Sequence, residues 1–512
     1  MLGESEVSAT NIDIGRQLFV DDALIETTSG VVRHWNKPVK IDEPVIWPGL
    51  AGAAPKTAKF ATPDDPVNLT CATDGGLWWD PVRRKFRLWY QADWLGDACY
   101  AESDDGLKWD FPDLGAVPGT NRLFGDDVAL DSWGVTPNYA AENPYADWKL
   151  HVSSPGGCTD DRLWESRDGI HFAPLGLAGR SGDRSTSYYD PFRGAWVFSL
   201  RDYRDKVGRS RRYFASRDFG GASCRWSWPG DKDEPESHRG LREPDEWLAV
   251  DGAGSSRSLY SFNAVAYESV MLGVMEILVT TEHDNDDCAK VGLPKQTGLH
   301  FCFSRDGKTF APREGTDIAP EGWGSGAWDA GYLSCTGGVC VIRGERLWFY
   351  YSGLRGDGLR RSDSGVKWYR NGMYSNGAIG VATLRRDGFA GMVADGAGEI
   401  VTKPLVFDGG HLFVNAECRF GSVAAEVLGE DGKPLPGFSV ADCAALRHAD
   451  STKYELRFTG GSLAALAGRS ARLRFILHCV TLYSFWISPS ERGESRGYVA
   501  AGGPDYPGLR DL

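Results

Sequence analysis

The sequence predicts an all-β protein, with a five-bladed β-propeller followed by a C-terminal β-sandwich. Three observations carry this prediction: a short turn motif that recurs five times, apolar strands upstream of these turns, and alternating strands after the last turn. Composition agrees, because 64 Gly and 26 Pro in 512 residues supply frequent turns and 19 Trp supply large side chains for packing between sheets. We place the propeller, with an N-terminal closing segment, at 1–395 and the sandwich with the C-terminal tail at 396–512.

The recurring motif is a tetrapeptide turn. Asp can bond its own backbone two residues on, and Gly accepts a positive φ without steric cost, so each copy predicts a tight turn. An aromatic residue follows four of the copies, at Trp109, Phe172, Phe310 and Phe389. The copies read SDDG at 103–106, SRDG at 166–169, SRDF at 216–219, SRDG at 304–307 and RRDG at 385–388.

Apolar strands precede these turns, at 86–90, 148–152, 196–200, 274–279 and 347–351. Before three of them lies another strand, across a tight link at Asp80-Pro81, Asp190-Pro191 or Glu268-Ser269. The order strand, turn, strand, Asp-Gly turn, outer strand is typical of a propeller blade. Five copies of the turn therefore predict five blades.

After the last turn the pattern changes to period-two alternation, which is typical of an antiparallel sandwich. The predicted strands cover 399–405, 411–417, 424–428, 454–458, 471–477 and 481–487. The N-terminal segment 17–25 is also strand-like. It either closes the propeller ring by pairing with the last blade or packs on the sandwich.

Charge and composition exclude several classes of protein. The formal net charge of -14 argues against a nucleic-acid partner, whose phosphates would be repelled. No apolar run is long enough to span a bilayer, and the 11 Cys lack the short paired spacings of a zinc site. The first residues lack the regions of a signal peptide. The compartment stays open, secreted or periplasmic if a leader was removed and cytoplasmic otherwise, and the oligomeric state is not predicted.

A propeller followed by a sandwich, with the turn SDDGLKW at 103–109, resembles the furanosidase-type glycoside hydrolases of families 32, 43 and 68. The segments LFVDDALIE, GGLWWDP, DRSTSYYDPFR, AYESVMLG and IGVATLRRDGF also resemble a group of bacterial glycoside-hydrolase-like proteins. The resemblance implies a carbohydrate substrate and glycosidase activity. The chain lacks the Trp-x-Asn-Asp-Pro-Asn-Gly and Arg-Asp-Pro motifs of the named families, so the resemblance implies the architecture and no individual catalytic residue.

Carboxylates that precede the inner strands are the candidate catalytic groups, because the starts of these strands converge on the channel funnel. Glycoside hydrolysis needs two carboxyl groups there, one protonated and one ionised. Blade two offers Asp131 or Asn138, with an uncertain register. The other blades place Asp74, Asp183, Asn263 and Asp329 at this position.

Asp183 and Arg184 form the sharpest candidate pair. A guanidinium beside a carboxylate lowers the pKa of the acid and offers forked donors to a substrate. We therefore predict Asp183, with Asp74 or Asp329, as catalytic groups, Asn263 as a ligand for a sugar hydroxyl and Arg184 as a substrate ligand. The alternative is that these Asp residues only bond structural turns.

The links between second and third strands reach the same rim. In blade four the link 280–287 contains Glu282 and His283, which we predict as an acid and a substrate ligand. This acidic link could instead bind a structural Ca²⁺ or be a solvated loop, and no other metal or cofactor is expected. In blade three, Arg201 begins the corresponding link and could bind an anionic sugar.

Among the aromatic residues of the inner strands, Trp78 and Trp328 lie nearest the proposed acids and are predicted to stack on sugars. Alternate residues of a strand point into the blade interface, so about half of these aromatics should be core. Glu268 lies in an apolar run, where burial would raise its pKa. It aligns with Asp80 and Asp190 at the opposite end of the inner strand, and we interpret all three as turn residues.

Three functions fit these residues. The first is a glycosidase that acts on a plant or algal poly- or oligosaccharide by carboxylate acid/base catalysis in the funnel. The second is a non-catalytic carbohydrate-binding propeller. The third is a lyase acting on a uronate-containing glycan, for which Arg184, Arg201 and His283 would supply the base and the anion ligands.

Overall fold

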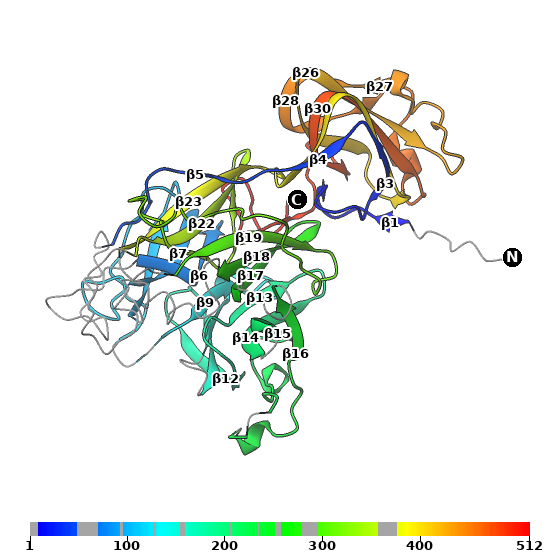
Figure 1. Cartoon of the computed structure of the whole chain (residues 1–512). Coiled ribbons are helices and arrows are strands. Elements are labelled where there is room, and N and C mark those ends of the chain that lie inside the picture. Colours follow the sequence, from blue (N-terminus) through cyan, green and yellow to red (C-terminus); the bar gives the residue numbers. More distant parts are fainter. Residues whose placement is uncertain are drawn as a thin grey trace.

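The computed structural model describes residues 9–48, 70–92, 96–125, 128, 130–153, 159–204, 207–230, 232–233, 235–250, 258–278, 295–356 and 376–512. Within these ranges the regular structure consists of β-strands and a few short 3-10 helices. No helix in the described ranges could cross a membrane. The all-β fold class is confirmed, with five sheets as the blades of a propeller and a separate sheet domain formed mainly by the C-terminal part of the chain (Figure 1).

The first three blades follow one another along the chain and pair their strands in sequence order. Blade 1 contains β6 (Thr70–Asp80), β7 (Lys85–Ala92) and β8 (Asp97–Ser103). Blade 2 contains β9 (Trp133–Pro137), β10 (Trp148–Val152), β11 (Asp160–Ser166) and β12 (Ala173–Arg180). Blade 3 contains β13 (Thr186–Asp190), β14 (Ala195–Arg204), β15 (Gly208–Ser216) and β16 (Asp245–Ala249).

The last two blades recruit strands from the chain ends. Blade 4 contains β17 (Ser258–Glu268), β18 (Val270–Leu278) and β19 (Thr297–Ser304), and β31 (Tyr498–Val499) pairs with the end of β17. Blade 5 contains β20 (Tyr332–Cys335), β21 (Val341–Arg343), β22 (Arg346–Leu354) and β23 (Gly377–Arg385). Strand β5 (Val39–Lys40) pairs with β23 as the outermost strand of blade 5.

The N-terminal segment therefore serves both parts of the molecule. Within the predicted segment 17–25, β2 (Gln17–Leu18) pairs with a strand of the sandwich sheet. The strand that closes the ring lies further along the chain, at Val39–Lys40, and passes beside β23 in Figure 1. Of the two alternatives for 17–25, packing on the sandwich is the observed one.

The Asp-Gly turns lie at the ends of the third strands, as their chemistry requires. In three copies, the Ser Oγ accepts the Gly N–H, and the Asp carboxylate accepts the backbone N–H groups two and three residues on. The fifth copy differs, because the carboxylate of Asp387 receives Arg16, Tyr267 and Ser484 instead. The fifth copy is also a turn, with the Gly388 N–H donating to Arg385 O at 2.9 Å, but its carboxylate is buried and bonds groups outside the turn.

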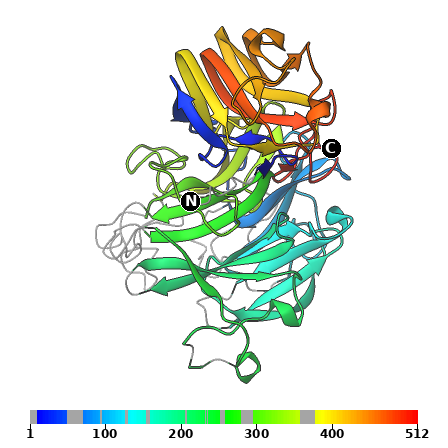
Figure 2. The same ribbon diagram turned by 90° about the vertical axis from the view of Figure 1, so that its right-hand side faces the viewer.

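The C-terminal part is built on a seven-stranded sheet in the order β28-β26-β30-β24-β3, with β2 and β4 paired at its sides. Two short sheets, β1-β25 and β27-β29, complete the sandwich. In Figure 2 the N-terminal strands, in blue, lie beside the yellow strands of this domain. The chain N-terminal to the propeller thus contributes edge strands to the C-terminal sheet. The large strands are β24 (Ala390–Thr402), β26 (His411–Leu428), β28 (Leu446–Glu455) and β30 (Arg472–Ser488), joined by β3 (Ile25–Ser29) and β4 (Val32–Trp35). The short ones are β1 (Thr10–Asn11), β25 (Leu405–Val406), β27 (Cys443–Ala444) and β29 (Arg457–Phe458).

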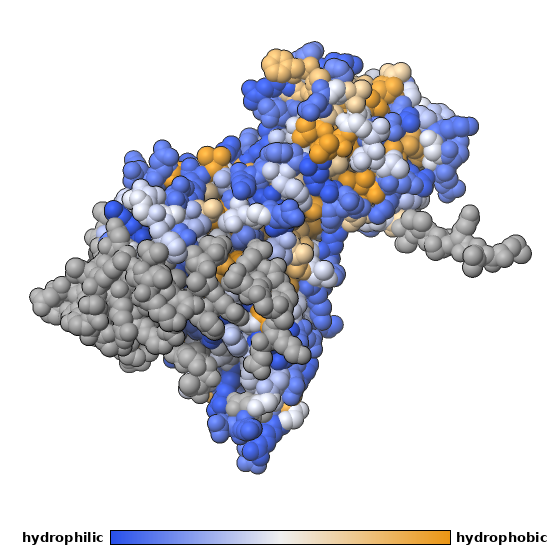
Figure 3. All heavy atoms as spheres, in the orientation of Figure 1, coloured by the Kyte–Doolittle hydropathy of each residue, from blue (hydrophilic) through white to orange (hydrophobic). Residues whose placement is uncertain are grey.

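Two pairs of predicted strands in this domain are single strands. The predicted strands at 411–417 and 424–428 both lie in β26, and those at 471–477 and 481–487 both lie in β30. Register shifts between the paired segments explain the difference, because a β-bulge interrupts alternation much as a turn does. On the face seen in Figure 3, apolar side chains come to the surface mainly on this domain.

A buried cluster of charged groups joins the two domains. Arg386 donates to Glu268 at 2.7 Å, and Arg16 pairs with Asp387 at 3.0 Å. Burial opposes ionisation of Asp387, but the charges of Arg16 and Arg386 outweigh it and lower the pKa of Asp387 to about 2. Ser484 of β30 also donates to Asp387, at 2.7 Å. Propeller, N-terminal segment and sandwich are thus held by one set of polar contacts.

Candidate functional site

All five blades meet at the side chain and backbone of Arg184, which precedes β13. Its guanidinium pairs with Asp74 of blade 1 at 2.8 Å and with Glu276 of blade 4 at 2.7 Å. It also donates to Ser334 Oγ of blade 5 at 2.8 Å. The backbone N–H of Arg184 donates to Ser132 Oγ, directly before the first strand of blade 2, at 2.9 Å. One residue therefore marks the axis of the propeller.

The backbone around this cluster adopts conformations that ordinary residues avoid. Asp74 has φ 58° and Arg184 has φ 62°, in the left-handed region that costs a non-Gly residue free energy. Two glycines of neighbouring blades allow the close approach, since a Cβ on Gly134 or Gly337 would lie within 2.9 Å of Asp74 O. Such strained residues cluster at functional sites, where the surrounding structure holds them in place.

Burial controls the electrostatics of the floor. Burial raises the pKa of Asp74 to about 6, although the Arg184 charge opposes the shift. Burial also disfavours the charged form of Arg184, but the carboxylates of Asp74 and Glu276 outweigh it and hold the pKa of Arg184 above its ordinary value. Arg211 donates to the Arg184 carbonyl at 2.7 Å, and burial lowers the pKa of Arg211 to about 9. Charged side chains thus form a buried, mutually paired cluster at the centre of the propeller.

Two further carboxylates, Asp131 and Asp183, lie beside this cluster. Burial raises the pKa of Asp131 to about 6, and the nearby charge of Asp183 acts in the same direction. Asp183 pairs with Arg201 at 2.6 Å and keeps 31 % of its side chain exposed. Gly182 permits this contact, since a Cβ there would meet Arg201 Cδ at 2.5 Å. The pKa of Asp131 is therefore above that of an ordinary Asp, while its neighbour Asp183 is paired with a cation and partly exposed.

Aromatic rings and cations line the adjacent wall. The Lys295 ammonium lies 3.9 Å from the centre of the Tyr260 ring and 4.4 Å from that of Tyr332. The Arg209 guanidinium lies 4.9 Å from the Tyr260 ring centre. The two rings meet edge to face, with centroids 5.7 Å apart. Tyr260, Tyr332 and Lys295 are all buried, so these contacts belong to the packing beside Arg184.

Four predicted residues, Asp74, Asp183, Arg184 and Arg201, lie in this cluster. Asn263 is buried in β17, and its Oδ1 accepts the backbone N–H of Ala264. Between the two predictions for blade two, Asp131 is the residue at the channel end. Asn138 follows the other end of β9 and bonds Asp147 at 2.7 Å.

The remaining predicted residues have other surroundings. Asp329 is buried against Lys40 of β5 and the Tyr351 hydroxyl, at 2.7 and 2.9 Å. The Trp328 ring stacks on Tyr351 with centroids 5.3 Å apart. The Trp78 indole is buried and donates to Val135 O of blade 2 at 2.8 Å. Glu282 and His283, with the Ca²⁺ alternative for 280–287, lie outside the described residues.

Glu276 is the central residue that the sequence reasoning missed. It is the single acid in the apolar strand β18, where a fully buried carboxylate requires a partner. Glu268 is likewise an acid in an apolar run, and the sequence analysis considered it instead of Glu276. Glu268 lies at the far end of β17, in contact with Arg16, Arg386 and Ser495. In the part of the chain that the structure describes, no cluster of three or more His, Cys, Asp or Glu side chains could hold a metal.

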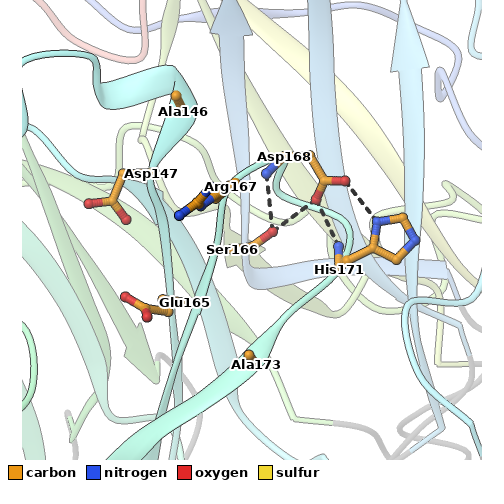
Figure 4. Close-up of a pocket in the computed structure, with 8 residues that line it drawn as sticks. All are labelled: Ala146, Asp147, Glu165, Ser166, Arg167, Asp168, His171 and Ala173. Carbon is orange, nitrogen blue, oxygen red and sulfur yellow. Dashed lines mark hydrogen bonds and ion pairs between the residues drawn. The ribbon is translucent and has the colours of Figure 1, made fainter.

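A hollow of about 630 Å³ lies away from the channel, on the outer strands of blade 2 (Figure 4). Its lining includes the Asp-Gly turn, in which Asp168 bonds His171 and Ser166. Slight burial opposes ionisation of Asp168, but hydrogen bonds from His171 and Ile170 hold its pKa below the ordinary value. These hydrogen bonds stabilise the Asp-Gly turn itself, so we assign the hollow no binding role.

No protein-family model matches the chain, and no curated protein matches it. Solved structures do resemble it. An N-acetylgalactosamine deacetylase from F. plautii, in complex with blood group B trisaccharide, has a TM-score of 0.44 and 13 % identity, covering 70 % of this chain and 97 % of its own.

Two hydrolases show a similar level of likeness. The GH32 β-fructofuranosidase of Bombyx mori has a TM-score of 0.37 and 10 % identity, covering 83 % of this chain and 92 % of its own. The catalytic domain of the Coprinopsis cinerea GH62 α-L-arabinofuranosidase has a TM-score of 0.39 and 12 % identity, covering 68 % and 97 %. At such low identity, the function of this chain has to be inferred from its own side chains.

Proposed function

We propose that the protein is a glycoside hydrolase whose reaction takes place at the end of the channel beside Arg184. The observation that carries the proposal is the pair Asp131 and Asp183. Burial raises the pKa of Asp131 to about 6, while Asp183 is ion-paired with Arg201 at 2.6 Å. Glycosidic hydrolysis requires one protonated and one ionised carboxyl group, and the raised pKa suits Asp131 to the first role. As substrate we propose an oligo- or polysaccharide of plant or algal origin.

In this proposal, Asp131 is the general acid that gives its proton to the glycosidic oxygen as the bond breaks. Asp183 is the ionised group that acts at the sugar carbon, as nucleophile or through an activated water. Arg201, which keeps 24 % of its side chain exposed, orients the sugar through its forked donors, whereas the buried Arg184 holds Asp74 and Glu276 in place. Asp74 and Glu276 are positioning residues, because their described contacts are with Arg184 and with neighbouring Ser side chains.

Charge-neutral substitution of each acid tests the proposal. A panel of aryl glycosides and plant and algal polysaccharides first identifies a substrate. Asp131→Asn and Asp183→Asn should then each lower kcat by about 10² to 10⁴, because loss of a general acid or base commonly costs that much. The matched control is Asp104→Asn, since Asp104 is 76 % exposed on blade 1 and pairs only at the surface with Lys85.

Two outcomes would overturn the assignment. Full turnover by either channel variant would remove that carboxylate from the mechanism. Saccharide binding without turnover by the wild-type chain would favour a carbohydrate-binding propeller over a hydrolase.

A further inference from the structure

Three neighbouring strands of the sandwich bulge at one level. Between β26 and β30 the register jumps, so that the four residues 418–421 lie opposite the two residues 479–480. Between β30 and β24 it jumps again, and the two residues 395–396 of β24 lie opposite the single residue Cys479. Aligned irregularities in adjacent central strands are unusual in a sheet, and bulges commonly re-aim side chains next to binding sites.

The chain conformation at these bulges is tightly defined. A Cβ on Gly421 would lie 1.8 Å from His478 O, so the backbones of β26 and β30 touch there and only glycine fits. Cys479 has φ 44°, which a non-Gly residue adopts at a cost. The irregularity is therefore specified by the sequence.

The bulges surround a hollow of about 260 Å³ on the sheet. Phe420 stands at its edge with 86 % of its side chain exposed, more than any other large apolar side chain in the described part of the chain. Asp395 and Cys479 line the hollow from the neighbouring strands, and the Cys479 thiol donates to Asp395 O at 3.2 Å. An exposed ring thus lies beside a small concave surface.

Charged side chains hold the rim in a fixed arrangement. Arg419 donates to Glu417 at 2.9 Å and to Asp450 at 3.0 Å. Asp450 is held in turn by Arg385 at 2.6 Å. The rim therefore presents preordered donors and acceptors around one apolar face.

We infer that this hollow is a carbohydrate-binding site, in which one sugar ring stacks on Phe420 and its hydroxyls bond Arg419 and Glu417. The volume is below that of pockets for drug-sized ligands and suits a single ring. Large exposed apolar patches mark protein interfaces, whereas here one exposed ring lies beside a small hollow that is lined by both apolar and charged side chains. A sugar has an apolar C–H face and polar edges, and matches this pattern. The site is separate from the channel and does not depend on hydrolysis.

Electrophoresis of the full chain through gels containing arabinan, xylan, mannan, pectin or alginate tests the inference. The Asp183→Asn chain is the parent protein, so that hydrolysis does not remove the polysaccharide. At least one polysaccharide should retard it, and adding Phe420→Ala should raise the apparent Kd about tenfold, the size of a lost aromatic contact. The matched control is Val440→Ala, which trims another exposed apolar side chain of the sandwich, 45 % exposed.

Alkylation of Cys479 gives an independent readout at the hollow itself. The retarding polysaccharide should slow iodoacetamide labelling of the Cys479 peptide, and Cys479→Ser should remove that signal. The inference is overturned if no polysaccharide retards the chain, if Phe420→Ala binds as the parent does, or if labelling is unaffected. Retardation that the wild-type chain shows and Asp183→Asn lacks would place the binding in the channel, which would contradict the sandwich site and leave the proposed hydrolase intact.

Discussion

At the scale of single residues, the sequence identified the charged side chains at the centre of the propeller but not their partners. Asp183 and Arg184 are adjacent in the chain, and the sequence pointed to them as a pair. In the structure they have different partners, Arg201 for Asp183 and Asp74 with Glu276 for Arg184. The reason is the positive φ of Arg184, which turns the two side chains apart. The residue types were enough to find Asp183 and Arg184 in the sequence, but their ion-pair partners depended on the backbone conformation at Arg184.

The titration of Asp131 gives a prediction for activity. If Asp131 is the general acid, it must be protonated, so kcat/KM should fall as pH rises through about 6. The measurement is a pH–rate profile on the substrate found in the panel. Asp131→Asn should lose this limb along with most of its activity, and a wild-type profile that is flat between pH 5 and 8 would contradict the assignment.

The same shift predicts an effect on stability. Because the pKa of Asp131 is raised from 3.8 to about 6, its contribution to stability is present below pH 3.8 and lost as pH rises through 6. Asn cannot ionise, so Asp131→Asn should gain stability relative to the wild type by about 2 kcal/mol between pH 4 and pH 7.5. Urea unfolding at the two pH values measures this difference. If the stability difference between Asp131→Asn and the wild type were the same at both pH values, Asp131 would have the same pKa in the folded and unfolded chains.

At the scale of elements, turns were predictable and ends of strands were less so. The Asp-Gly turns depend on bonds within five residues, and the sequence therefore located the third-strand ends of the blades. The sequence left Asp131 and Asn138 as alternatives in blade two. The alternation of side chains reveals a strand, but it does not reveal which end of the strand faces the funnel. Glu276 lies on a second strand, and its approach to Arg184 of another blade leaves no local pattern.

The contrast between two copies of the turn predicts different stability losses. Asp387→Ala removes the nearer of the two carboxylates that pair with the buried Arg16, and breaking a buried pair costs about 3–5 kcal/mol. Asp306→Ala removes an exposed turn acceptor, and we expect about 1 kcal/mol, as for a lost helix cap. Chemical unfolding of both variants at pH 7 provides the comparison. Equal losses would mean that the fifth turn has no special role.

For the whole molecule, the two domains should unfold together. The sandwich sheet takes β2, β3 and β4 from before the propeller and β24 to β30 from after it. Buried ion pairs between Arg16, Glu268, Arg386 and Asp387 join the parts. Calorimetry should show one transition, and limited proteolysis under native conditions should release no folded sandwich. A stable C-terminal fragment would contradict this.

The closing strand at Val39–Lys40 also has a consequence for synthesis on the ribosome. Its partner β23 begins at Gly377, so more than 300 residues must be translated before the pair can form. At about 5–20 residues per second this takes tens of seconds. During that time the early strands have neither the last blade nor the sandwich to pair with. Until then the edges of these N-terminal strands stay unpaired, which is the state in which nascent chains are prone to aggregate.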